Sequence, residues 1–543
     1  MADEPSAAST STRFSPAEAV MAQVWEDVLG VDGVGLDDDF FACGGDSLLA
    51  ITVVAEAGRR GLRIALPQLF EHPTVRGTCR ASAHGGPDRP PARVDLLSPA
   101  DRAKVPAHVQ EVMPATRLQL GLIYESLMSA GAQYVCTAAH DIRKPLDEAT
   151  LREALARVAS RHEMLRVRFE LGGFSEAVQI VEHGVEIPLT VADHSALDAS
   201  ALEKRTALVM KELGRPFDPE TAPLVRFHAA ATGAESYRLT YSFHHAVLDG
   251  WSAANLLHET VTVYAGLLDG DVPELARPLP YAEYVRLERA AARSEEAVRH
   301  FEAWARGEEH RPARAVPHPP RMTEFEARVS RADTETLFAC AAARGLPVKS
   351  LLLTAHGAAV AAERGRPVVD VAMMMIGRPE QEGTDLTLGL FVNYLPIRLD
   401  LRGTTWAGAA RRAFDAEREL LPHRRFPYAD ALGIVGSRPF EVCFNYAHLR
   451  RNIQLVEAGV VARGQYSDLG VGIPVVVDVH NTGDGLAVRV SVDTSRHDAA
   501  LGSRLLSRLL EGIRLMAGSP ETECLPSTAT VRRSSGERER AEK

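Results

Sequence analysis

A short segment rich in glycine and proline divides the chain into two parts of very different size. This segment, AHGGPDRPPAR at residues 83–93, excludes regular secondary structure because glycine is conformationally free and proline lacks a backbone donor. About 80 residues precede it, and a continuous body of over 400 residues without internal repeats follows it. A body of that length exceeds a usual single domain, so we expect it to fold as two lobes.

Composition and charge exclude several classes of protein. The formal charge of −11 argues against a nucleic-acid partner, which needs basic surface. The six cysteines form no C-x-x-C pair, which excludes a zinc ribbon or a disulfide framework and is typical of a reducing cytoplasm. The polar, acidic start is no signal peptide, and no apolar run is long enough to span a membrane. We therefore expect a cytoplasmic protein with no nucleic-acid or membrane partner.

The part before the divide has the pattern of a small helical bundle. Ser15, Pro16 and Glu18 predict a capped helix start with a capping box. A second helix is expected after the GGDS turn and should stop near Gly58, and LPQLFEHPTVRG predicts a third. This unit is too small for an enzyme with a cleft.

The GGDS stretch within this bundle has two interpretations. In one, two glycines make a turn and Asp46 or Ser47 caps the next helix. In the other, Ser47 stands exposed at a helix start, where backbone N–H groups favour a phosphate-linked group. The first 47 residues carry ten carboxylates against one arginine, a surface that attracts basic patches on partner proteins.

The stretch DDDFFACGGDSLLAITVVAE, with EHPTV at residues 71–75, resembles a peptidyl carrier domain. The resemblance implies that Ser47 carries 4′-phosphopantetheine as a covalent cofactor. It also implies two partners, a phosphopantetheinyl transferase that attaches the arm and an adenylation enzyme or domain that loads it.

A pair of adjacent histidines marks the larger part. YRLTYSF at residues 237–243 alternates in polarity and predicts a strand, so His244 and His245 should point to opposite faces. Metal ligands need alternate positions on a strand or i, i+4 on a helix, so we expect no metal site. Either both histidines are satisfied core residues, or one faces a reaction path and the other packs behind it. Asp249 should lie at a turn that Gly250 permits, before a helix starting near residue 251 or 252.

FHHAVLDGW at residues 243–251 resembles the HHxxxDG signature of condensation domains from nonribosomal peptide synthetases. Further segments fit the family in order and spacing across residues 111–520: RHEMLRVRF at 161–169, PYAEYVRL at 280–287, GRPE at 377–380, GLFVNYLPIRL at 389–399 and CFNY at 443–446. Val167 and Tyr394 stand where the family commonly has threonine, which leaves the subtype open.

The resemblance implies a multidomain chain: a small all-α carrier bundle followed by a two-lobed α/β condensation domain. The larger domain should have the chloramphenicol-acetyltransferase-like fold, with a tunnel between its lobes and the signature at the middle. The expected boundaries are a carrier at 14–82, a linker at 83–110, an N-terminal lobe at 111–280, a C-terminal lobe at 281–522 and a disordered tail at 523–543.

The resemblance also implies roles for individual residues. His245 should orient the attacking amine and accept its proton, and His244, Asp249 and Gly250 complete the catalytic signature. Asp249 should act structurally by pairing with an arginine of the other lobe, for which Arg378 is the candidate. The remaining residues expected to shape the site or tunnel are Arg378, Trp251, Arg161, Asn393 and Asn445.

The implied reaction is amide formation between a donor acyl group on the carrier and the amine of an acceptor carrier protein or free amine substrate, in secondary metabolism such as antibiotic or siderophore synthesis. Epimerization is disfavoured because Trp251 replaces the usual valine, and heterocyclization is excluded because it has aspartates in place of both histidines. A catalytically silent recruitment module typically loses the second histidine or the glycine, and both are present. We expect a discrete two-domain protein, loaded in trans through the acidic face around Asp37–Asp39.

Overall fold

The computed structural model describes residues 14–45, 47–81, 96–128, 134–271, 273–306, 321–435, 440–447, 460–462, 472–482 and 485–525. Most of the predicted tail and the first half of the predicted linker lie outside these residues, as does Asp46.

The first unit is a bundle of four helices, α1 (Pro16–Leu29), α2 (Ser47–Arg59), α3 (Leu66–Glu71) and α4 (Val75–Ala81). The predicted capping box is confirmed: Glu18 N donates to Ser15 Oγ at 3.3 Å, and Ser15 N donates to Glu18 Oε2 at 2.9 Å. The prediction of a single third helix is wrong. α3 ends at Glu71, and its C-cap His72 leaves the helical region because it precedes Pro73. α4 begins beyond this break.

The N-terminal lobe is built on a five-stranded sheet in the order β12-β2-β7-β6-β5. Its strands are β2 (Val135–Ile142), β5 (Leu189–Asp193), β6 (Val225–Gly233), β7 (Ser236–His244) and β12 (Val460–Ala462). Its helices include α6 (Arg117–Met128), α7 (Glu148–Arg161), α8 (Ala199–Leu213) and α9 (Gly250–Asp269). A small sheet of order β1-β4-β3 flanks them, formed by β1 (Glu111–Pro114), β3 (Val167–Glu170) and β4 (Val178–Val181).

The C-terminal lobe is built on a six-stranded sheet in the order β10-β9-β11-β13-β14-β8. Its strands are β8 (Met322–Val329), β9 (Val368–Ile376), β10 (Val392–Asp400), β11 (Val442–Ala447), β13 (Val475–Asn481) and β14 (Leu486–Asp493). Its helices include α12 (Arg331–Ala342), α13 (Val348–Arg364), α14 (Trp406–Leu420), α15 (Tyr428–Val435) and α17 (Ala500–Gly518). The short helices α10 (Ala282–Ala292) and α11 (Glu295–Ala305) connect the two lobes.

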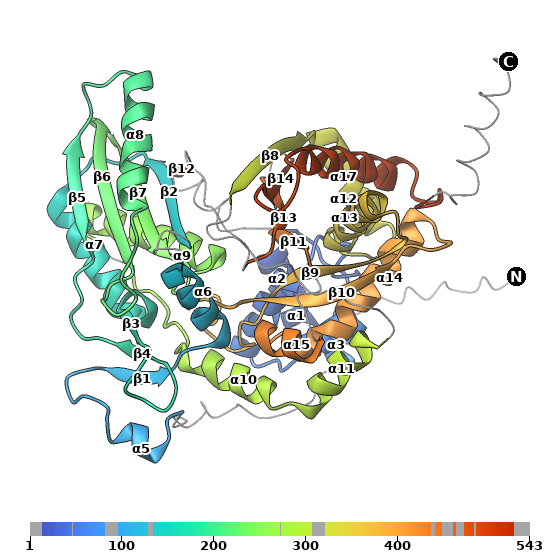
Figure 1. Cartoon of the computed structure of the whole chain (residues 1–543), viewed down its shortest axis with the longest axis horizontal. Helices are drawn as coiled ribbons and strands as arrows, with labels where there is room; N and C mark the ends of the chain where they lie inside the picture. Colours follow the sequence, from blue (N-terminus) through green and yellow to red (C-terminus); the bar gives the residue numbers. More distant parts are fainter. Residues whose placement is uncertain are drawn as a thin grey trace, which may run out of the picture.

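The lobes lie side by side, and the chain crosses between them more than once (Figure 1). Along the chain, β12 comes after β8, β9, β10 and β11, four strands of the C-terminal sheet. It nevertheless pairs antiparallel with β2 of the N-terminal sheet, with Val461 opposite Asp141. The described end of the predicted linker also packs on the N-terminal lobe, where Leu97 and Val109 join a small apolar cluster with Val178 and Ile180 of β4.

The carrier bundle packs against the C-terminal lobe, and the apolar cores of the two are continuous. Phe41 and Phe70 of the carrier contact Phe414 of α14, with ring centroids 5.1 and 6.2 Å apart. In Figure 1 the carrier helices, in blue, lie next to the C-terminal lobe, to which α14 contributes the aromatic contact.

Candidate active site

The adjacent histidines lie where the central strand of the N-terminal sheet gives way to a turn. β7 pairs with β2 on one side and β6 on the other, and its residues from Tyr237 to His244 are buried. The predicted strand is therefore confirmed, but it ends at His244, so His245 already belongs to the turn. The alternating orientation of side chains along a strand therefore does not extend to His245. The two imidazoles are oriented by separate hydrogen bonds within the turn.

His244 is bonded back into its own turn. Its Nδ1 accepts a hydrogen bond from Ala246 N at 3.1 Å, which fixes that nitrogen as unprotonated. Burial lowers the pKa of His244 to about 4, and neighbouring His245 contributes to the same shift. His244 is therefore a neutral, packed residue at pH 7.

His245 has the opposite arrangement of its ring nitrogens. Its Nδ1 lies 2.7 Å from Leu248 O, and because a carbonyl oxygen only accepts, Nδ1 carries the proton. In the neutral ring the basic lone pair then lies on Nε2. His245 is only 2% exposed, and its backbone N donates to Tyr134 O at 2.8 Å. The turn therefore presents a neutral imidazole of defined tautomer deep inside the protein.

Asp249 is the N-cap of α9, and both of its carboxylate oxygens are occupied. Oδ1 accepts from Ser252 N at 2.7 Å and from Arg378 Nη2 at 3.3 Å. Oδ2 accepts from Phe391 N at 3.1 Å, and Asp249 N donates to Gly389 O at 2.9 Å. The carboxylate holds the start of α9 against two segments of the C-terminal lobe.

Arg378 supplies the cation of this contact and is 1% exposed. Its Nη1 donates to Thr384 O at 2.7 Å and Thr387 O at 2.8 Å, and its guanidinium lies 4.0 Å from the centroid of the Phe391 ring. Burial lowers the pKa of Arg378, and the facing Asp249 opposes that shift. The structure thus brings together the two residues expected to pair, one from each lobe.

The first turn of α9 completes the connection between the lobes. Trp251 Nε1 donates to Asp385 O at 2.9 Å. Ser252 Oγ donates to Gly389 O at 2.8 Å and accepts from Arg378 Nη2 at the same distance. The expected turn at Gly250 is wrong, because α9 begins at Gly250 itself and that residue does not have a positive φ. Sequence reasoning missed Ser252, whose hydroxyl contacts the other lobe, because no motif in the sequence marks it.

Gln119 of α6 is a second residue that sequence reasoning missed. Its side chain is fully buried, and its Nε2 donates to Ala246 O at 3.0 Å and Gln179 Oε1 at 3.3 Å. Its Oε1 accepts from Thr116 N at 2.9 Å. Gln119 therefore fixes the turn that follows His245 through a contact separate from those of Asp249.

A buried glutamate lies at the start of the same helix. Glu288 Oε1 accepts from Arg117 N at 3.1 Å, at the first residue of α6. Burial raises the pKa of Glu288 to about 8, and the hydrogen bond from Arg117 opposes the shift.

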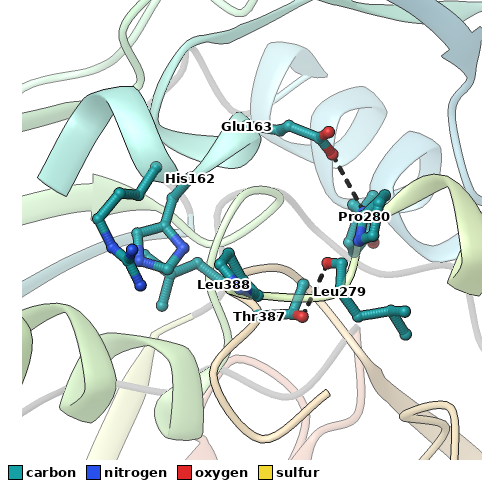
Figure 2. A pocket seen from close by; sticks show the side chains of 9 residues that line it. His162, Glu163, Leu279, Pro280, Thr387 and Leu388 are labelled. Atoms are coloured by element: carbon teal, nitrogen blue, oxygen red, sulfur yellow. Dashed lines mark hydrogen bonds between the residues drawn. The ribbon is translucent and has the colours of Figure 1, made fainter. Parts of the chain in front are cut away.

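Arg161, expected to shape the site, instead binds the helix that follows the signature. Its Nε donates to Glu259 Oε1 at 2.5 Å, and His162 Nε2 lies 2.8 Å from Glu259 Oε2. Arg161 also lines a small recess of roughly 50 Å³, whose lining residues are drawn in Figure 2. There Glu163 Oε2 accepts from Tyr281 N at 3.0 Å. This cluster joins α7, α9 and the segment before α10.

The two expected asparagines bind neighbouring segments of the C-terminal lobe. Asn393 Nδ2 donates to Phe426 O at 2.7 Å and Arg424 O at 3.0 Å, which holds the segment before α15. Asn445 Nδ2 donates to its cross-strand partner Asp478 at 2.9 Å. Both sets of bonds stay within that lobe, whereas the histidines belong to the other one.

Ser47 is the first residue of α2, a helix of 13 residues. The turn before it is tightly built: Gly44 has a φ of +92°, and a Cβ on Gly45 would lie 2.3 Å from the Phe40 ring. The expected exposure of the Ser47 side chain lies outside the described residues. Within those residues, no group of three or more histidine, cysteine, aspartate or glutamate side chains is placed to hold a metal ion. No described helix has the length and apolarity needed to cross a bilayer.

Comparison with known proteins identifies a family for each part of the chain. The condensation domain family matches residues 109–445, and the phosphopantetheine attachment site family matches residues 19–81. The chain is a carrier–condensation didomain of the nonribosomal peptide synthetase family. Its carrier belongs to the domains that hold a phosphopantetheine arm. These matches confirm the expected fold class and family.

The didomain is similar to segments of much longer synthetases. It is 31% identical to the AMB antimetabolite synthetase AmbE of Pseudomonas aeruginosa, over 96% of this chain and 25% of the relative. It is 29% identical to tyrocidine synthase 3 of Brevibacillus parabrevis, over 70% of this chain and 6% of the relative. The chain thus spans a quarter or less of these relatives.

Solved structures with a similar fold are condensation domains. The first condensation domain of the calcium-dependent antibiotic synthetase, in complex with a substrate analogue, has a TM-score of 0.63 at 20% identity and covers 77% of this chain. The condensation domain from a monacolin K polyketide synthase has a TM-score of 0.65 at 16% identity, also over 77% of this chain. Each of these chains is covered almost completely, so the fold extends over the whole condensation domain.

Proposed function

We propose that the didomain forms an amide bond between an acyl group held on Ser47 and the amine of an acceptor, with His245 as the residue that positions the amine and accepts its proton. The observation that carries this proposal is the fixed tautomer of His245. Leu248 O holds the proton on Nδ1 at 2.7 Å, so Nε2 is the basic nitrogen before any substrate arrives.

The energetics favour a positioning base of this kind over a strong one. An α-amine has a pKa near 8, so freeing its base form at pH 7.5 costs only about 0.7 kcal/mol. Bringing two reactants together is the larger barrier, and fixed geometry is worth roughly 7–11 kcal/mol. General-base assistance adds about 10²–10⁴-fold. His245 takes the proton that the attacking nitrogen loses as the C–N bond forms, and returns it to sulfur as the C–S bond breaks.

The carrier offers a suitable attachment point for the cofactor. When bound, the phosphopantetheine arm supplies the thiol that carries the acyl group as a thioester. The Ser47 position at the start of α2 fits this group, because the first turn of a helix presents backbone N–H groups to a phosphate. A long arm also suits a histidine that is only 2% exposed, since a tethered group can reach so deep.

Asp249 and Arg378 serve as positioning residues in this proposal. Both carboxylate oxygens of Asp249 are occupied by donors from the protein, so the carboxylate is not placed as a second base. Trp251 and Ser252 extend the same contact through Asp385 and Gly389.

The partners follow from the two activities. A phosphopantetheinyl transferase attaches the arm to Ser47, and an adenylation enzyme or domain loads it. The acceptor is a second carrier protein with a bound amino acid, or a free amine. We also propose that the domains have the boundaries expected from the sequence and that the protein is cytoplasmic.

The test is a single-turnover assay with the full chain. The chain is converted to its phosphopantetheine form, loaded with an aminoacyl group and mixed with an acceptor, and the products are identified by mass. A new amide that is lost in His245→Ala and Ser47→Ala supports the proposal. Inversion of the donor Cα without an amide would indicate an epimerization domain, and a loaded carrier that never reacts would indicate a recruitment module.

A further inference from the structure

The contact between the carrier and α14 has an aromatic centre. Phe41 and Phe70 of the carrier and Phe414 of α14 are 3%, 4% and 3% exposed. Phe41 meets Phe414 edge-on, with ring centroids 5.1 Å apart, and Phe70 stacks on it at 6.2 Å. Large apolar side chains buried between two folded units are the usual centre of a specific interface.

Charged residues surround this aromatic centre. The guanidinium groups of Arg411 and Arg418 lie 5.7 and 5.8 Å from the centroid of the Phe414 ring. On the carrier side, Asp37 and Asp38 are exposed, and Asp39 lies against Gly345, where a Cβ would meet its carboxylate at 3.4 Å. Asp39 thus lies beside the segment that Arg411 binds, since Arg411 Nη2 donates to Arg344 O at 2.8 Å, whereas Asp37 is paired with Arg76 within the carrier. Carboxylates and guanidinium groups lie on opposite sides of this contact, which is the charge pattern of a steered contact.

The carrier turn at residues 36–45 is held in shape by hydrogen bonds among its own residues. Asp39 Oδ1 accepts from Phe41 N at 2.9 Å and from Ala42 N at 3.0 Å. Gly45 N donates to Phe40 O at 2.8 Å. An enzyme that acts on Ser47 must approach this turn, because Phe41 precedes Ser47 by only six residues.

We propose that Arg411, Phe414 and Arg418, called the α14 face here, form a docking surface for the chain's own carrier turn, and that enzymes acting on Ser47 compete with it. A carrier docked on the α14 face has Phe41 covered, and an enzyme that needs the same turn gains access only when the carrier leaves. The docked and accessible states therefore exchange, and the α14 face sets their ratio. The competition rests on the proposed role of Ser47, whereas the docking itself does not.

The test uses the full chain with Arg411→Glu and Arg418→Glu combined. Arg411 is exposed and Arg418 is partly exposed, so the variant keeps the core of α14, while two new carboxylates repel the acidic turn. Hydrogen exchange followed by mass spectrometry should show about 10-fold faster exchange in the peptide covering residues 36–45. The initial rate at which a phosphopantetheinyl transferase modifies Ser47 from coenzyme A should rise by a similar factor.

The control is Arg157→Glu, which reverses one exposed charge on α7 of the other lobe and should change neither measurement. A second variant, Phe414→Leu, should speed exchange at residues 36–45 to a smaller degree because it removes the ring and keeps an apolar side chain. In 500 mM salt the ratio of variant to wild-type rates should fall toward one.

Equal exchange at residues 36–45 in wild type and in both α14 variants would overturn the docking surface. Faster exchange with an unchanged transfer rate would overturn the competition, and a complete lack of transfer in every chain would refute Ser47 as the attachment site while leaving the exchange result valid.

Discussion

Replacing Asp249 by asparagine removes the negative charge from a contact in which both partners are 1% exposed. The asparagine oxygen still accepts one bond, but its NH₂ group then faces either Phe391 N or Arg378, both of which are donors. Arg378 is left as a buried cation whose remaining acceptors are neutral. Breaking one side of a buried ion pair typically costs about 3–5 kcal/mol. We expect a loss of that size in the free energy of unfolding, measured as a shift of the urea midpoint at unchanged slope.

A double-mutant cycle with Arg378→Met separates the pair from its surroundings. Arg378→Met alone strips the donors from Thr384 O and Thr387 O, at about 1–3 kcal/mol each. The combined variant with Asp249→Asn should lose at least about 1.5 kcal/mol less than the sum of the single losses, because neither charge is then left alone. Asp400→Asn, in a largely exposed ion pair, is the matched control and should cost within about 1 kcal/mol. Additivity within about 0.5 kcal/mol would refute the coupling of the two residues.

Three further predictions concern the surroundings of this contact. His245→Ala should slow amide formation by about 10²-fold and, because it leaves Leu248 O without its donor, should also cost about 1–3 kcal/mol of unfolding free energy. His244→Ala should chiefly lower the melting temperature; a rate loss in His244→Ala alone, with His245→Ala fully active, would reverse these roles. Glu288 has its pKa raised to about 8, so it stays protonated in the folded chain while the unfolded chain loses the proton above pH 4.5. The free energy of unfolding should therefore fall by roughly 1.4 kcal/mol per pH unit between about pH 5.5 and 7.5, and Glu288→Gln should lack this slope in urea titrations at each pH. Gln119→Leu leaves Ala246 O without its donor, so it should cost about 1–3 kcal/mol of unfolding free energy and reduce the rate of amide formation; an unchanged rate would mean that the turn keeps its shape without Gln119.

Local features of the fold could be predicted because their causes lie within a few residues. Ser15 and Glu18 form their capping box within one helical turn, and the alternation of residues 237–243 is decided by neighbours along the strand. The start of α9 was predicted at residue 251 or 252 because Gly250 was assigned to a turn. In the structure Asp249 is the N-cap, so the helix begins at Gly250. The break between α3 and α4 was missed although Pro73 marks it.

The long-range contacts of the site could not be predicted from residue patterns alone. Gln119 lies 127 positions before the carbonyl it binds, and Glu288 lies 171 positions after the backbone donor whose hydrogen bond it accepts. A lone buried glutamine or glutamate has no periodicity that distinguishes it from a surface residue. The pairing of β12 with the sheet of the other lobe could not be predicted either, because three residues of a strand do not indicate which sheet they join.

The bonds around the signature connect Asp249 to the orientation of His245, the proposed base. The ring of His245 is oriented by Leu248 O, and Leu248 directly precedes Asp249. Asp249 N and its carboxylate are bonded to Gly389 and Phe391 of the C-terminal lobe, while the strand that ends at His244 belongs to the N-terminal lobe. The histidine therefore takes its position from one lobe, and the acceptor that fixes its tautomer is held by the other. Movement of the lobes would disturb the turn at residues 248–249, so the orientation of the His245 ring depends on an intact contact between the lobes.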